Sequence, residues 1–527
     1  MTELAGTLTL ARFIARRDRV RIVVWIASIV ALLLVTALSV KGLYPTQASL
    51  DEAVTAFGNN AAAIAFNGPA QGLDTLGGEV AFQVGATGLV VVALMSLLMT
   101  GRLTRFEEEA GRLELVRSMA VGRHAPAAAA LIVVSAMNVL LAALVTAGLA
   151  GLGLPLTGSL VLGASYGVLG LLFAAAAMVA AQITENTRVV YGSCGAVLGA
   201  AFALRAAGDV GDGTLSWLSP IGWAQKARPF AGEKWWPLLI AIAVTGGLIV
   251  LATVLADRRD LGAGLVASRG GPAVAPRSLN GPLGLAVRLQ RGTVIGWSAG
   301  LFATGIAYGW VADDIQDLVG DNKAMQDMIA RAGGVSLTNS YLSTSLLMLA
   351  LVGAGFAIAS ALRLRSEETA LRAEPILATS VSRRRWVASH LAVALGGSVI
   401  VLAAGGLGTG LAYGIVSGDP PQVPRLLGAA LVQLPAVWLL VGLATALFGL
   451  LPRGVAVAWA ALAVCLVVGV FGELLDLPGW LSRVSPFEHI PQPPAAAVSV
   501  VSLVVITAAA AGLVSAGLGA FRRRDVG

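Results

Sequence analysis

Charged side chains concentrate in two short segments of an otherwise apolar chain, and they offer ion pairing with a protein partner. When the sequence is shifted by 260 residues, 365–383 lies over 105–123, with identical residues at 8 of 19 positions, six of them charged. The identical pairs are Arg105/Arg365, Glu107/Glu367, Glu108/Glu368, Ala110/Ala370, Arg112/Arg372, Glu114/Glu374, Val121/Val381 and Arg123/Arg383. Only 12% of all residues are charged, so this match indicates an internal duplication.

Each copy has features of a short helix. In the first charged segment (104–123), Thr104 and Glu107 have capping-box spacing, and three glutamates fall in the predicted first turn. In the second charged segment (365–383), Ser366 is the candidate cap. Pro375 lies inside this segment and predicts a helix one to two turns shorter. The alternative is that both segments are ordinary charged loops at a membrane surface.

Motifs for catalysis are missing from the sequence. There is no G-x-x-x-x-G-K-[ST] loop, so this chain cannot hydrolyse ATP alone. No cysteine and histidine cluster has the spacing of a zinc site, and the three histidines are His124, His390 and His489. We therefore expect neither an enzyme nor a bound metal or cofactor.

The elements that must position the charged segments are membrane spans. Hydrophobic residues make up 57% of the chain and the mean hydropathy is +0.82, which predicts an all-α polytopic membrane protein. Six spans are predicted in each half: 22–42, 80–101, 126–152, 157–182, 189–207 and 236–256, then 294–311, 340–362, 387–416, 424–450, 454–475 and 495–520. The charged segments fall between the second and third span of each half.

Basic amphipathic stretches precede the first span of each half, at 8–21 and 282–293. Aligning Trp25 with Trp297 places Arg16 on Arg288. Residues 257–281 are rich in Gly, Pro and Arg without periodicity. We therefore divide the chain into a first half (1–256), a cytoplasmic linker (257–281) and a second half (282–527).

The distribution of positive charge predicts the orientation in the membrane. Of the 36 lysines and arginines, 27 lie on the face that holds the N-terminus and both charged segments. By the positive-inside rule this face is cytoplasmic, and both termini lie there. The same bias accounts for the net charge of +7 without a nucleic acid partner.

Acidic residues are expected to be absent from the middle of the spans, because Glu185, Glu473 and Asp476 all fall at span ends or in loops. Carriers driven by protons or sodium place acids near the membrane midplane. A partner protein that supplies energy is therefore favoured. An ion-coupled carrier with twelve spans and a non-transporting scaffold or sensor are the alternatives that we keep.

This pattern resembles the permease subunits of ABC-2 type exporters, in the double-length form known as antibiotic or polyketide exporter permeases of high-GC Gram-positive bacteria. The resemblance covers nearly the whole chain. It rests on 107–123 (EEEAGRLELVRSMAVGR), on 367–386 (EETALRAEPILATSVSRRRW), on the basic pre-span stretches and on the Ser-Pro pairs at 219–220 and 485–486. One departure is that Gly111 and Leu115 are replaced by Leu371 and Pro375 in the second copy.

The resemblance implies a transporter of the bacterial plasma membrane that exports hydrophobic or amphipathic compounds such as antibiotics. The charged segments would be coupling helices that dock two copies of a separate ATPase, which holds ATP and magnesium. The implied coupling residues are Arg105, Glu107, Glu108, Glu109, Arg112, Glu114, Arg117, Arg123, Arg365, Glu367, Glu368, Arg372, Glu374 and Arg383. A second, smaller contact would involve Thr184, Glu185, Arg188, Pro452 and Arg453.

The substrate would occupy a mainly apolar cavity between the halves. Met95, Met99 and Asn138 are distinctive side chains expected near it, although we assign none of them as a substrate ligand.

Overall fold

The chain folds into two compact units, Met1–Gly271 and Pro272–Gly527. The computed structural model describes residues 3–58, 61–260, 262–266, 271, 273–279, 281–320, 337–471, 480 and 483–524, and these residues form helices and no strands. Twelve of the described helical stretches are long and apolar enough to cross a membrane, six in each unit. The predicted all-α polytopic fold is confirmed.

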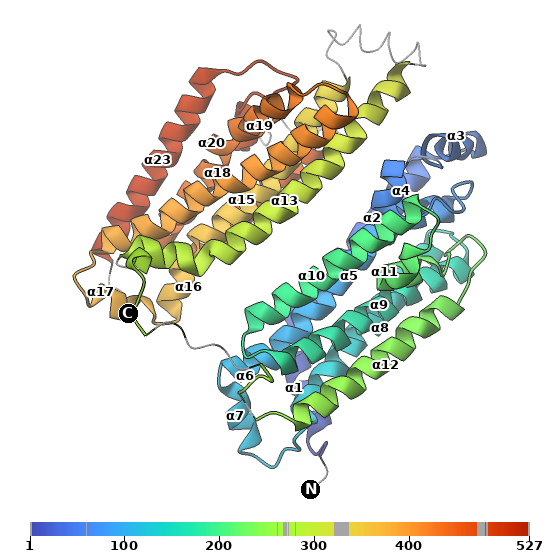
Figure 1. Cartoon of the computed structure of the whole chain (residues 1–527), viewed down its shortest axis with the longest axis horizontal. Coiled ribbons are helices and arrows are strands. Elements are labelled where there is room, and N and C mark those ends of the chain that lie inside the picture. Colours follow the sequence, from blue (N-terminus) through green and yellow to red (C-terminus); the bar gives the residue numbers. More distant parts are fainter. Residues whose placement is uncertain are drawn as a thin grey trace. The chain divides into compact units, whose positions relative to one another are not determined.

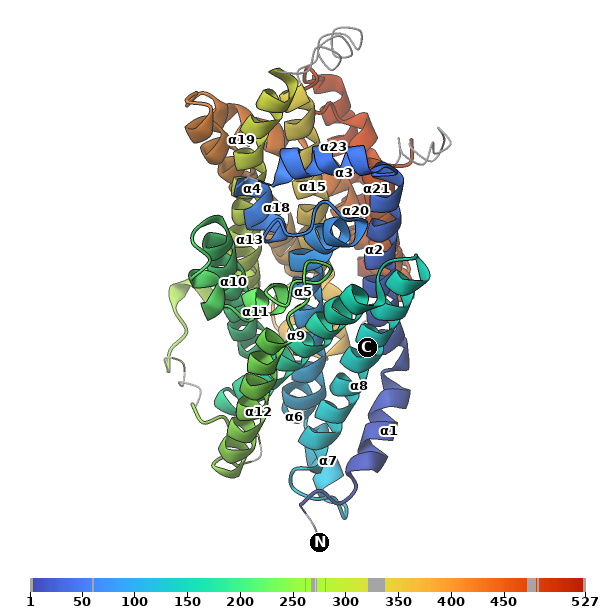
Figure 2. The ribbon, with the colours of Figure 1, turned by 90° about the vertical axis from the view of Figure 1, so that its right-hand side faces the viewer.

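The first unit begins with the amphipathic helix α1 (Thr7–Arg17). Its six spans are α2 (Arg19–Leu43), α5 (Leu76–Gly101), α8 (Ala125–Gly151), α9 (Leu156–Ile183), α10 (Thr187–Val210) and α12 (Trp236–Asp257). Two short helices, α3 (Gln47–Phe57) and α4 (Ala61–Asn67), lie at the end of this unit opposite α1 (Figure 1, Figure 2). A third, α11 (Pro220–Gln225), begins where the Ser219 hydroxyl accepts hydrogen bonds from the backbone N–H groups of Ile221 and Gly222.

The second unit repeats this order of spans. Its spans are α13 (Pro282–Gly320), α15 (Leu337–Ala361), α18 (Arg383–Val416), α19 (Gln422–Val432) continued by α20 (Leu434–Leu450), α21 (Ala456–Phe471) and α23 (Val500–Arg523). Two short helices, α16 (Arg363–Thr369) and α17 (Ala373–Leu377), follow the second span. The predicted span 454–475 extends beyond α21 into 472–475, which lie outside the described residues, as do Glu473 and Asp476.

The basic stretch 282–293 was expected to be separate from the first span of the second half, and the structure shows that it is not. It is the start of α13, which continues through the predicted span without interruption. In the first unit, α1 and α2 are separated at Asp18, whose side chain is almost fully buried among arginines. Gln290 aligns with Asp18, and its side-chain oxygen accepts a hydrogen bond of 2.6 Å from the Ser360 hydroxyl.

The core of the first unit is built around α9, along which α5, α8 and α12 pack. Asn138 is fully buried here and exchanges hydrogen bonds with Ser96 on α5. Met95 and Met99 belong to the same core. These three residues are therefore packed inside the first unit, and their expected position near a substrate cavity stays a prediction.

In the second unit, α13 packs along α18 at glycine positions. A Cβ atom on Gly305 would lie 2.2 Å from the carbonyl oxygen of Gly405, and one on Gly309 would lie 2.3 Å from that of Thr409. Such distances are shorter than any real carbon–oxygen contact, so only glycine permits this approach of the two backbones. Small residues thus set the packing of the first span against the third.

Candidate functional site

The first charged segment continues the second span instead of starting a new helix. After α5 the chain forms a π-helical turn, η1 (Arg102–Phe106), then α6 (Glu107–Glu109) and, beyond a break at Gly111, α7 (Arg112–Arg117). The Thr104 hydroxyl donates to the carbonyl of Thr100, 2.7 Å away. The predicted cap at Thr104 is wrong, because the helix of the second span supplies partners for these backbone N–H groups.

The second charged segment has the same break. Leu371 occupies the position of Gly111, and both residues have left-handed backbones, with φ of +56° and +71°. Ser366 lies inside α16 and does not cap it. Pro375 is the third residue of α17, where a missing N–H removes no helical hydrogen bond. The second helix is therefore one residue shorter than α7, not one to two turns.

Two ion pairs recur in both segments with the same spacing. Arg105 binds Glu108 at 2.8 Å, and Arg365 binds Glu368 at 3.1 Å. The preceding glutamate of each segment contacts the arginine five residues later: Glu107 with Arg112 and Glu367 with Arg372, both at 2.9 Å. The sequence identity between the segments thus corresponds to a shared arrangement of side chains.

Each of the two glutamates at 107 and 367 also contacts a further arginine. Arg17, at the end of α1, lies 3.2 Å from Glu107, and Arg363 lies 2.7 Å from Glu367. These contacts tie the charged segment to the end of the amphipathic helix in the first unit and to its own helix start in the second.

Asp18, which no sequence pattern singled out, connects α1 to the end of the second span. Its carboxylate contacts Arg17, Arg21 and Arg102 at 2.9, 2.6 and 3.1 Å. Burial opposes ionisation, but hydrogen bonds from Arg17 and Arg21 and the charge of Arg102 outweigh it, so the pKa of Asp18 lies below its usual value. The carboxylate is held ionised at neutral pH.

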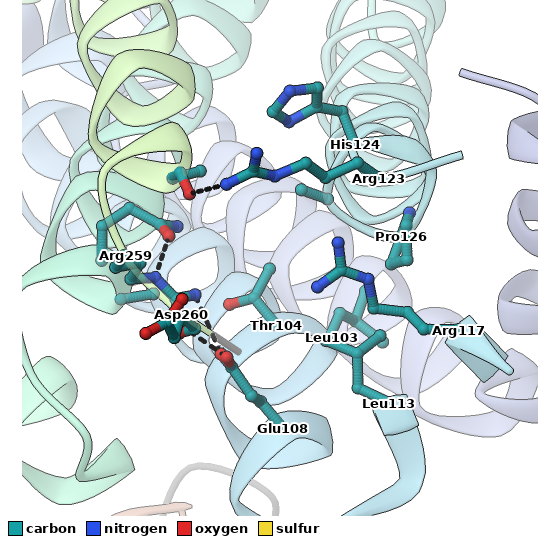
Figure 3. Close-up of a pocket in the computed structure, with 14 residues that line it drawn as sticks. Leu103, Thr104, Glu108, Leu113, Arg117, Arg123, His124, Pro126, Arg259 and Asp260 are labelled. Atoms are coloured by element: carbon teal, nitrogen blue, oxygen red, sulfur yellow. Dashed lines mark hydrogen bonds and ion pairs between the residues drawn. The ribbon is translucent and has the colours of Figure 1, made fainter. Parts of the chain in front are cut away.

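Two arginines at the ends of the sixth spans, Arg259 and Arg524, were also missed. Arg259 donates two hydrogen bonds to the Glu108 carboxylate, at 2.6 and 3.0 Å (Figure 3). Arg524 forms the matching ion pair with Glu368. A second repeat in the sequence could have identified these arginines: Arg-Arg-Asp occurs at 258–260 and at 523–525, and residue 525 lies outside the described residues. Part of the predicted linker therefore packs on the first charged segment.

The last arginine of each segment faces the same span end. Arg123 donates to the carbonyls of Ala256 and Asp257, at 3.1 and 3.2 Å, and Arg383 donates to the carbonyl of Arg524 at 2.5 Å. His124 lies 3.1 Å from the Asp257 carboxylate. The two arginines thus supply hydrogen-bond donors to carbonyls that the end of a helix leaves without partners.

The loop between the fourth and fifth spans lies beside the first charged segment. Glu109 accepts hydrogen bonds from the N–H and hydroxyl of Thr187, at 3.0 and 2.5 Å. In the same loop, Thr184 and Glu185 are half-buried and Arg188 is exposed. In the second unit Pro452 is half-buried, Arg453 is exposed, and Thr369 replaces Glu109.

The remaining charged residues lie at the surface. Arg112 and Glu114 are exposed on α7 beside Leu115, whose side chain is 69% exposed. Leu371, Arg372 and Glu374 form a corresponding exposed group in the second unit. Arg117 instead extends into a pocket bounded by Leu103 and Leu113, which Arg123 also lines (Figure 3).

Two acids have buried side chains near span ends, and neither lies in the middle of a span, where acids are expected to be absent. Glu79 is in the first turn of α5, where its carboxylate accepts a hydrogen bond of 2.9 Å from Gln83. Asp209 is at the end of α10, 3.5 Å from the fully buried Arg205. Arg205 also donates to the carbonyls at the end of α4. Both acids lie at the span ends opposite the charged segment. Among the described residues, no cluster has the composition of a metal site.

Comparison with known proteins agrees with the resemblance found in the sequence. A family model described as the C-terminal domain of the multidrug efflux system permease Rv1217c matches residues 279–522. The chain is 41% identical over 524 residues to the multidrug efflux system permease protein Rv1217c of Mycobacterium tuberculosis (strain ATCC 25618 / H37Rv). The alignment covers 99% of this chain and 95% of that protein. Together with the twelve candidate spans, this identity shows that the chain is a multi-pass membrane protein and belongs to this family of multidrug efflux permeases.

Proposed function

We propose that this permease is the membrane subunit of an ATP-driven exporter and that each charged segment docks one copy of a separate P-loop ATPase. The ATPase holds ATP and magnesium, since this chain has no phosphate-binding loop of its own. Both termini and both charged segments face the cytoplasm, in accord with the distribution of arginine.

The observation that carries this proposal is the repeated division of each charged segment into an inner and an outer group. Inner acids such as Glu108 and Glu367 are buried in ion pairs within their own unit. The outer group of each unit exposes a leucine next to one charged residue, Leu115 beside Glu114 and Leu371 beside Arg372. An exposed apolar side chain within a charged rim is a common form of protein contact surface.

The expected cargo is a hydrophobic or amphipathic small molecule. The Mycobacterium tuberculosis relative is named as a multidrug efflux permease. Long apolar spans with few charged side chains also suit compounds that partition into the membrane.

The docking test uses substitutions of outer residues only. Glu114→Lys with Leu115→Asp in the first unit should weaken docking at that site by about tenfold, equivalent to a loss of about 1.4 kcal/mol, so that one ATPase copy co-purifies instead of two. Glu52→Lys, an exposed acid on α3 at the opposite end, is the control and should leave co-purification unchanged. Normal co-purification and transport by the double variant would refute docking at this surface. Reversal of Glu107 or Glu108 is a less specific test, because it also breaks internal ion pairs.

The buried Glu79 keeps the ion-coupled carrier as the second candidate, because carriers of that kind use intramembrane acids. The two candidates differ in a direct assay. If Glu79 serves ion coupling, transport in proteoliposomes follows an imposed proton or sodium gradient without ATP, and Glu79→Gln abolishes it. The exporter proposal predicts no transport under those conditions. An ATPase that binds the chain without any transport would instead favour a scaffold.

A further inference from the structure

The second arginine of the Arg-Arg-Asp repeat at the end of the sixth span in each unit, Arg259 or Arg524, contacts both the charged segment and the end of the fourth span. We infer that Arg259 and Arg524 are positioning residues that fasten the charged segment to the fourth and sixth spans of their own unit. Movement imposed on the segment by a docked ATPase then moves these spans with it. This inference rests on the proposed docking function and assigns the path by which docking acts on the spans.

In the first unit the fastening involves both side chain and backbone. Arg259 binds the Glu108 carboxylate through two nitrogens and donates from Nε to the side-chain oxygen of Gln182, 2.7 Å away, at the end of α9. The N–H of Gly262 donates to the same carboxylate at 2.8 Å, and Arg105 donates to the carbonyl of Gly262 at 2.7 Å.

Little water reaches this cluster. The Glu108 side chain is 4% exposed and that of Arg259 is 12% exposed. A paired charge with so little solvent around it is bound more firmly than an exposed ion pair. Removal of Arg259 leaves Glu108 with only Arg105 and the Gly262 N–H as partners. Arg259 is the member of this cluster that also reaches the fourth span, through Gln182.

In the second unit a different local sequence builds the same connection. Arg524 pairs with Glu368 through one nitrogen and donates through the other to the carbonyl of Phe448, 2.9 Å away, near the end of α20. Its guanidinium also lies 5.1 Å and 5.3 Å from the ring centres of Phe448 and Phe521. The fourth span thus supplies a side-chain amide in one unit and a carbonyl with an aromatic ring in the other.

The connection is reciprocal in each unit. Arg123 and Arg383, the last arginines of the two charged segments, donate to backbone carbonyls around the ends of α12 and α23. In each unit, an arginine at the end of the sixth span therefore contacts the charged segment, and an arginine of the segment contacts the end of the sixth span. Contacts of this kind resist both separation and sliding, because each pair restrains a different point of the segment.

The test measures the number of substrate molecules transported per ATP hydrolysed by the full complex in proteoliposomes. Arg259→Ala and Arg524→Ala should each retain the ATPase through co-purification but lower this ratio by about tenfold, while ATP hydrolysis continues. Arg259→Lys, which keeps the charge but loses the two-point contact, should give an intermediate ratio. The matched controls are Arg258→Ala and Arg523→Ala, the exposed neighbouring arginines, which should keep the wild-type ratio.

The outcomes separate this inference from the proposed function. If the wild-type chain purifies without any ATPase, the proposed function is refuted. A wild-type complex that transports, together with Arg259→Ala and Arg524→Ala variants of unchanged ratio, would refute the positioning role alone. If an alanine variant fails to reach the membrane, the Arg259→Lys variant decides: a wild-type ratio contradicts the inference and a lowered ratio supports it.

Discussion

Glu107 and Glu108 are neighbours in sequence but serve different connections. Glu107 faces the arginines of α1 and α7, whereas Glu108 faces Arg105 and the arginine beyond the sixth span. Adjacent helical residues point in directions about 100° apart, which allows one turn to connect two neighbouring elements. The charge pattern alone predicted that these acids matter. It did not predict their partners, since Arg17 and Arg259 are distant from them in sequence.

Leu371 holds a left-handed backbone conformation that disfavours side chains with a Cβ. Leu371→Gly should therefore raise the free energy of unfolding by about 0.5 to 1 kcal/mol, since glycine adopts this conformation without strain. Leu115→Gly is the control, because Leu115 lies within the regular helix α7 and glycine there should destabilise by about 1 kcal/mol. Thermal unfolding of the purified variants measures both. A lower melting temperature for Leu371→Gly would contradict the account.

Asp18 predicts a pH dependence of stability. Its pKa is lowered in the folded chain, so its carboxylate stabilises the fold at neutral pH, and this contribution disappears as the pH falls through the folded pKa, below the usual value of about 3.9. The melting temperature of wild type should exceed that of Asp18→Asn at pH 7, and the difference should shrink below about pH 4. A difference that stays constant over this range would show that the carboxylate charge contributes nothing.

At the scale of elements, the number of spans and their approximate positions could be predicted from apolar run length. The local breaks could not. A helix start at Thr104 was expected from capping residues, but the second span continues through them. The stretch 282–293 was expected to be separate from the first span, but no residue like Asp18 interrupts α13. Side-chain contacts from other elements decide such helix boundaries, and these contacts cannot be predicted from a single sequence.

The packing of α13 on α18 predicts a strong dependence on one glycine. Gly305→Val places a side chain where the carbonyl of Gly405 lies, and should lower the free energy of unfolding by about 3 kcal/mol or more. Gly300→Val is the control on the same helix, because a Cβ there has no atom within 4 Å. Melting temperature and the yield of monodisperse protein measure the effect. Equal losses for both variants would indicate a general intolerance of valine instead of close packing.

At the scale of the whole molecule, the duplication was readable from the sequence because charged residues are rare in this chain. It corresponds to two compact units that share the same ion pairs. The two units also differ: Glu109 connects the first charged segment to the loop between spans four and five, and Thr369 takes its place in the second. We therefore expect one chain to supply two docking sites of unequal strength.

The measurement that tests the central claim most directly is the mass and composition of the tagged chain purified in mild detergent from its native membrane. The account predicts one copy of this chain with two copies of a P-loop ATPase, and transport in liposomes that requires ATP. A chain that purifies alone and moves its substrate without ATP would contradict it.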